Sequence, residues 1–239
     1  KLEYKFDRLE DLIHVTSTAF LGLTVKCARC HHHKFDPIPQ TDYYRFASIF
    51  WPGDLMGNKS DPVKGFDVFA WSDVTSTPAP IHLLKKGNPR KPMQEIEPRF
   101  LSVIESLDTP FEKRQAADAD TGRRLQFANR MIDQRNPLLA RVIVNRVWQH
   151  YFGYGIVRTP NNFGYKGDLP THPELLDWLA SELIENDWNL KPIHRLILLS
   201  RTYRQDSSRN LGDPVEGGSP LADPLNLYLG RMNRKRQVF

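Results

Sequence analysis

The spacing of apolar residues divides the chain into two helical parts and an irregular middle. Over residues 7–25, apolar side chains recur every three or four positions, which predicts a helix with one buried stripe. An aromatic stretch at 42–50 predicts a second, shorter helix. Residues 51–100 are rich in proline and glycine and show little periodicity, and within them only 80–84 has the pattern of a strand.

Capping signals predict four helices in the carboxyl-terminal part. A Thr-Pro-Phe-Glu capping box at 109–112 and a Thr-His-Pro-Glu box at 171–174 each predict a helix start. Asn-Pro at 136–137 predicts a helix that runs to Phe152, and Lys-Pro at 191–192 predicts another. The expected fold is mainly α, with helical domains joined by an irregular Pro/Gly-rich section that has a few short strands.

This pattern divides the chain into three sections. The first domain occupies residues 1–52, a linking region 53–108, and a second, helical domain 109–239. Because Lys1 is not an initiator methionine and the chain stops abruptly after Phe239, we expect both ends to be cuts within a longer protein.

Composition and charge narrow the class of protein. The 239 residues are 40% hydrophobic and 26% charged, and the longest nearly uncharged stretch, 15–25, is too short for a transmembrane segment. The net charge of +5 comes from interspersed cations, which favours a solvated basic surface and argues against nucleic-acid binding. With only two cysteines, the chain is not a disulfide scaffold.

The two cysteines form a CysXXCysHis motif, Cys27-Ala28-Arg29-Cys30-His31. In a helical turn, this spacing brings two thiols to one edge of a porphyrin, and the imidazole that follows reaches the iron. The motif therefore predicts covalent haem c, with Cys27 and Cys30 as tethers and His31 as proximal iron ligand. The sequence names no opposite iron ligand.

Two other readings of the cysteine pair stay open. The pair is also half of a zinc site, which His31, His32, His33 or Asp36 would have to complete, since structural zinc takes four N or S ligands. A thioredoxin-like redox pair should open a helix after a strand, whereas here a predicted helix precedes the motif.

A second polar cluster lies on the predicted helix 136–152. Its polar face carries Arg141, Asn145 and Gln149, with Arg146 and His150 beside them. One interpretation is a structural network that supports the turn after the helix. The other is a pocket of Arg141, Asn145, Arg146 and His150 that binds haem propionates or an anionic sugar through charged hydrogen bonds. No hydrolase motif or other catalytic constellation is present.

Residues 20–38, with Gln40 and residues 42–44, resemble the PSCyt-type planctomycete cytochrome-like family. Later segments resemble its usual partner, the PSD-type domain: 136–138, 140–142, 144–150, 152–153, 155–160, 163–164, 170–179, 194–197 and 202–205. The resemblance covers nearly the whole chain. It implies the end of the first domain followed by most of the second.

The resemblance and the motif together imply a function. Such proteins are large exported proteins of uncharacterised activity, so an extracytoplasmic location, periplasmic or secreted, is expected. We expect covalent haem c binding and electron transfer with a redox partner protein. The alternative is a non-catalytic binding or scaffold module, for an acidic polysaccharide for example, whose cysteine turn holds a structural zinc.

Overall fold

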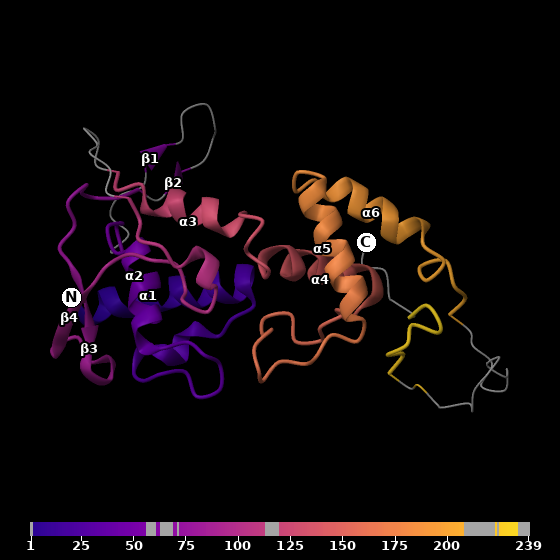
Figure 1. Ribbon diagram of the computed structural model, residues 1–239, viewed down its shortest axis with the longest axis horizontal. Coiled ribbons are helices and arrows are strands. Elements are labelled where there is room, and N and C mark those ends of the chain that lie inside the picture. The colour runs from indigo at the N-terminus through magenta and orange to yellow at the C-terminus, as the bar shows by residue number, and fades with distance from the viewer. Residues whose placement is uncertain are drawn as a thin grey trace. The chain divides into compact units, whose positions relative to one another are not determined.

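The structure is a computed structural model that describes residues 2–55, 61–62, 69–70, 72–112, 120–207, 223 and 225–233 (Figure 1). The chain forms two compact units, Lys1–Leu139 and Ala140–Phe239. The described part is mainly α-helical, with six α-helices and two two-stranded sheets, as the sequence predicts. None of its helices combines the length and the apolar character that crossing a membrane requires.

Unit 1 begins with α1 (Leu2–Thr16), which buries Phe6, Leu9 and Ile13. It continues as a π-turn (Ser17–Leu21) that ends at Gly22, whose φ of 62° lets its amide reach the Ser17 carbonyl. The helix predicted over residues 7–25 therefore begins earlier, at Leu2, and its helical turns end earlier, at Leu21. The cysteine motif lies on a separate 3₁₀ turn, Val25–Arg29, so the prediction of one continuous helix up to residue 25 is wrong.

The core of unit 1 is built around α2 (Gln40–Phe50), whose side chains are almost all buried. Phe46 and Phe50 pack on Phe127 of α3 (Arg123–Met131), with ring centroids 5.1 and 6.1 Å apart. Asp42 is fully buried, and its carboxylate accepts hydrogen bonds from the Ser102 amide and hydroxyl. These contacts tie α2 to residues that lie far along the chain.

The irregular section is an integral part of unit 1. Strand β3 (Ile81–Leu84) confirms the predicted strand, and it pairs with β4 (Pro92–Ile96) in an antiparallel hairpin. The second sheet pairs β1 (Asp61–Pro62) with β2 (Phe69–Ala70). Short 3₁₀ turns cover Lys85–Gly87 and Glu105–Leu107.

The helix predicted from the capping box at 109–112 does not form at these residues. Pro110 instead makes a β-bridge with Arg99, and the Phe111 amide donates to the Pro98 carbonyl over 3.3 Å. The extended backbone buries Phe111, whose ring lies under the Arg130 guanidinium. Tertiary packing thus overrides the local helix signal.

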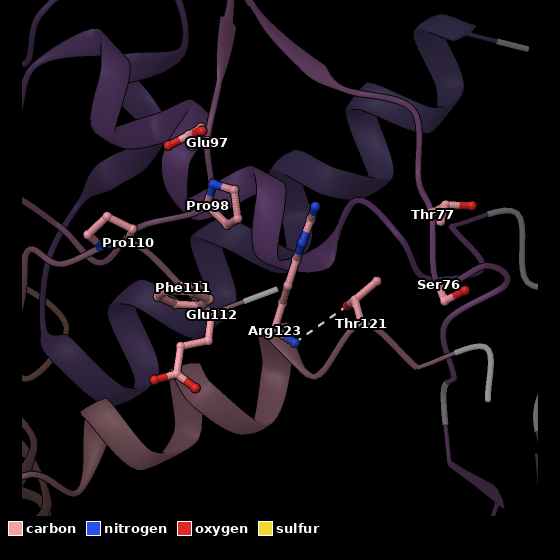
Figure 2. Close-up of a pocket in the computed structure, with 9 residues that line it drawn as sticks. All are labelled: Ser76, Thr77, Glu97, Pro98, Pro110, Phe111, Glu112, Thr121 and Arg123. Atoms are coloured by element: carbon pink, nitrogen blue, oxygen red, sulfur yellow. Dashed lines mark hydrogen bonds between the residues drawn. The ribbon is translucent and has the colours of Figure 1, made fainter. Parts of the chain in front are cut away.

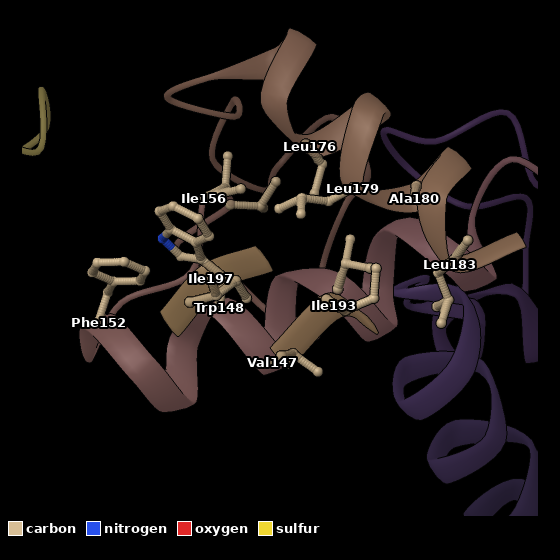
Figure 3. Close-up of a cluster of buried hydrophobic side chains, with 13 residues drawn as sticks. Val147, Trp148, Phe152, Ile156, Leu176, Leu179, Ala180, Leu183, Ile193 and Ile197 are labelled. Carbon is tan, nitrogen blue, oxygen red and sulfur yellow. The ribbon is translucent and has the colours of Figure 1, made fainter. Parts of the chain in front are cut away.

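Unit 2 packs three helices, α4 (Leu139–Phe152), α5 (Pro173–Glu185) and α6 (Leu190–Leu199). Their bounds confirm the predicted helices of this part to within a few residues. Figure 3 shows apolar side chains of all three helices converging on one cluster, in which Trp148 and Phe152 stack with centroids 4.1 Å apart. The Asn189 side chain caps α6 by accepting from the Lys191 amide.

Candidate functional site

The cysteine motif lies on the 3₁₀ turn Val25–Arg29 and the residues that follow it. Val25 and Ala28 point inward and are fully buried, whereas Cys27 and Cys30 are exposed, free thiols. The turn thus packs against unit 1 through its apolar positions and presents both sulfurs to solvent.

Salt bridges to α1 hold the basic residues of the turn. The Glu10 carboxylate pairs with Lys26 at 2.8 Å and also with Arg29, whose guanidinium lies 3.4 Å from Asp7. Burial raises the pKa of Glu10, but hydrogen bonds from Arg29 and Lys26 outweigh it, so this pKa lies below its ordinary value. The charges of Lys26 and Arg29 are therefore both paired with acidic residues of α1.

Hydrogen bonds from α2 fix the backbone of the motif. The Arg29 carbonyl accepts from Gln40 Nε2 over 2.8 Å and from the Tyr44 hydroxyl over 2.9 Å. Gln40 Nε2 also donates to the Leu84 carbonyl at the end of β3. The peptide between Arg29 and Cys30 is thereby held by two side chains of α2, one of which also binds the end of β3.

Gly87 brings the β3–β4 hairpin against the second thiol. A Cβ at this residue would lie 2.5 Å from Cys30 Sγ and 3.4 Å from the Arg29 carbonyl oxygen. The φ of Gly87 is +71°, a left-handed conformation that favours glycine. Both the conformation and the close approach therefore require a residue without a side chain.

Hydrogen bonds distinguish His31 from His32. His31 Nδ1 lies 2.5 Å from the His32 carbonyl oxygen, which can only accept, so this nitrogen carries the proton. The Nε2 lone pair of His31 is then available, and donation from the other ring nitrogen to a carbonyl is the usual support of a metal-ligating histidine. His32 Nδ1 instead accepts from the Gln40 amide, so in the neutral ring its Nε2 carries the proton.

His33 has a structural role. Its Nδ1 accepts from the Asp36 amide over 2.8 Å, and its Nε2 lies 3.3 Å from the Thr24 hydroxyl. Neither ring nitrogen therefore faces a vacant position. Within the described ranges, no three His, Cys, Asp or Glu side chains come together as a metal site. The donor set fits haem c, which takes two thioethers and one imidazole, better than four-coordinate zinc.

The structure separates the four polar candidates of α4. Asn145 is fully buried, and its amide bonds the Val157 amide at 2.8 Å and the Val157 carbonyl at 2.9 Å. Arg141 pairs with Asp177 of α5 at 2.6 Å. Arg146 and His150 line a common cavity, of about 420 Å³, together with Gln149, Gly153, Pro160 and Asn161.

A further cavity, of about 410 Å³, lies in unit 1 beside the start of α3 (Figure 2). Arg123 lines it and donates from Nη1 to the Ser48 carbonyl over 2.8 Å. Glu97 and Glu112 also line it, and in Figure 2 their carboxylates lie apart rather than facing each other as an acid–base pair.

The residues that support the motif were not assigned this role by sequence reasoning. Gln40 and Tyr44 fall within the segment that resembles a known family, but the haem chemistry of the motif gives them no part. Leu84 and Gly87 lie more than 50 residues beyond Cys30 in the irregular section, where no local pattern signals contact with a thiol.

These observations define a class: a mainly α-helical protein of two units with a CysXXCysHis turn exposed on the first. The family model PSCyt2, a protein of unknown function (DUF1549), matches residues 1–54, and PSD1, a protein of unknown function (DUF1553), matches residues 123–238. The chain therefore belongs to the proteins in which a PSCyt2 domain is followed by a PSD1 domain. Comparison with curated proteins and with solved structures gives no match.

Proposed function

We propose that Cys27, Cys30 and His31 bind one haem c covalently and that unit 1 serves in electron transfer. The observation that carries the proposal is the combination of two exposed thiols with one available imidazole lone pair. Both sulfurs are accessible for attachment. Among the three consecutive histidines, only His31 combines a protonated Nδ1 with an available Nε2.

Each residue has a separate part in this function. Cys27 and Cys30 tether the group through thioether bonds, and His31 Nε2 ligates the iron. The His32 carbonyl orients the imidazole, while Gln40 and Tyr44 fix the backbone between the tethers. When bound, the haem supplies an iron that gains and loses one electron.

An extracytoplasmic location belongs to the same proposal. In bacteria, covalent haem ligation takes place outside the cytoplasm, so the complete protein should be exported. The complete reading frame and the fractionation of its product test this part. A full-length protein found only in the cytoplasm would contradict haem attachment.

Two matched variants test the role of the imidazole. His31→Asn keeps a donor near Nδ1 for the His32 carbonyl but removes Nε2, whereas His32→Asn keeps an acceptor for the Gln40 amide. The full-length protein and both variants are matured in a haem-ligating host. We expect all three to give the pyridine haemochrome spectrum of covalently bound haem. Only His31→Asn should change the spectrum of the native iron.

The cysteine variants complete the experiment. Cys27→Ala and Cys30→Ala should each abolish covalent haem, which denaturing gels stained for haem detect. An unchanged native spectrum in His31→Asn would refute the ligand assignment. Stoichiometric zinc without covalent haem would refute the function and favour the scaffold module with a structural metal.

A further inference from the structure

The tip of the β3–β4 hairpin is rich in positive charge and has no acidic residue of its own. Residues 74–94 contain Lys85, Lys86, Arg90 and Lys91 but no aspartate or glutamate. The close approach of Gly87 to Cys30 Sγ brings this tip directly beside the second thiol of the motif. A segment distant in sequence thus places its lysines at the candidate redox site.

The motif side of the same surface is also free of acids. Residues 24–35 contain Lys26, Arg29 and Lys34 and no acidic residue. Of the neighbouring acids of α1, Glu10 pairs with Lys26 and Arg29, Asp7 lies near Arg29, and Glu3 pairs with Arg90 at 3.0 Å. The exposed Asp11 also acts on Lys26, but from beyond ion-pair distance.

Four cations remain, which we call the basic rim: Lys34, Lys85, Lys86 and Lys91. All four are exposed, and among the residues that the structure describes no acid lies within ion-pair distance of them. Exposed charges of one sign around a site raise the local concentration of oppositely charged partners and their association rate.

We propose that the basic rim is a docking surface for an acidic electron-transfer protein that approaches the edge carrying Cys27 and Cys30. The electron-transfer part rests on the proposed function. The positive potential at the thiols does not depend on haem, so the two can fail separately.

The thiols themselves report the potential in the haem-free chain. The dianionic disulfide dithiobis(nitrobenzoate) and the neutral dithiodipyridine both react with exposed thiolates. At a separation on the order of 10 Å in water, one lysine accelerates a dianion about 2.7-fold at an ionic strength of about 0.01 M and about 1.5-fold at about 0.15 M. The ratio of the two reagents' rates isolates this effect from changes in thiol exposure.

The test variant is Lys85→Gln with Lys91→Gln, and the control is Lys85→Arg with Lys91→Arg. Lys86 is left intact because its φ of 52° is a conformation that substitution could disturb. We expect the glutamine pair to lower the rate ratio about sevenfold at about 0.01 M salt and about twofold at about 0.15 M, and the arginine pair to leave it unchanged. An equal ratio in wild type and both variants would overturn the positive potential.

The partner class is tested on the haem-loaded full-length protein with a flavodoxin, an acidic one-electron donor protein. The rate at which flavodoxin reduces the haem should fall as the salt concentration rises. At low salt, this rate should be at least about threefold lower in the variant with Lys85→Gln and Lys91→Gln than in the wild type. A rate of haem reduction that changes neither with salt nor in this variant would overturn the docking role. Saturable binding of polygalacturonate that the glutamine pair abolishes, with no effect on flavodoxin, would reassign the rim to polysaccharide. A failure of haem attachment alone would contradict the proposed function and leave the thiol result standing.

Discussion

Replacing Gly87 with alanine separates the two reasons for a glycine beside the motif. At a φ of +71°, an alanine costs about 1–2 kcal/mol of unfolding free energy. Its Cβ would also lie 2.5 Å from Cys30 Sγ, well inside normal contact distance. Because the Cys30 side chain is exposed and ends at that sulfur, we expect it to rotate away, which adds about 0.5–1.5 kcal/mol if the new χ1 is unfavourable.

The assay is urea denaturation of unit 1 in a set of four variants. Gly87→Ala should lose about 1.5–3.5 kcal/mol, the sum of both effects. Gly87→Asn keeps the overlap with Cys30 but tolerates the left-handed conformation, so it should lose less. Gly87→Ala in a Cys30→Ala background has no sulfur to displace and should lose only about 1–2 kcal/mol relative to Cys30→Ala alone.

Thiol reactivity gives an independent readout of the displaced sulfur. In Gly87→Ala, labelling with a neutral reagent should change at Cys30 and stay the same at Cys27, as measured on the separated peptides. An equal stability loss with and without the Cys30 sulfur, together with unchanged Cys30 labelling, would show that the close approach has no energetic effect.

Two further predictions concern the packing around the sites. Glu10→Gln should lose about 1–3 kcal/mol by removing the carboxylate that pairs with Lys26 and Arg29. The folded-state pKa of Glu10 is depressed below 4.5, so the stability difference between wild type and Glu10→Gln should be constant above that pH. It should disappear as the pH falls through the folded-state pKa. A stability difference that does not change with pH would contradict the ion pairs. Asn145→Ala should lose about 2–4 kcal/mol in thermal and urea denaturation, since it leaves the buried Val157 amide and carbonyl without their bonds at 2.8 and 2.9 Å. A loss below about 1 kcal/mol in the alanine variant would refute the role of these bonds.

The sequence was most informative where structure depends on local signals. The helices of unit 2 were predictable because apolar periodicity, prolines at helix starts and the stop at Gly153 all act within a few residues. The capping box at 109–112 has equally good local signals, yet Phe111 is buried by an extended backbone. That choice depends on Arg99 and Arg130, which no local pattern connects to it.

The candidate site divides in the same way. The thiols and His31 follow from the spacing of the motif alone. The distinction between His31, His32 and His33 could not be predicted, because it depends on which carbonyl or amide each ring meets in the folded loop. For the same reason, the sequence could not tell that Asn145 is committed to Val157 while Arg146 and His150 line a cavity.

The hydrogen bonds from Gln40 and Ser102 have a consequence for how this protein can be divided. The PSCyt2 match ends at residue 54. Ser102, the hydrogen-bond partner of the buried Asp42 carboxylate, lies beyond that residue, and so does Gly87, which approaches Cys30. A piece that ended at residue 54 would contain every residue of the motif. Its Asp42 carboxylate would lack the two hydrogen bonds from Ser102, and Cys30 would lack its contact with Gly87. The first structural unit therefore extends well beyond the family match, and a piece meant to keep the contacts of the site should run to the end of unit 1, at Leu139.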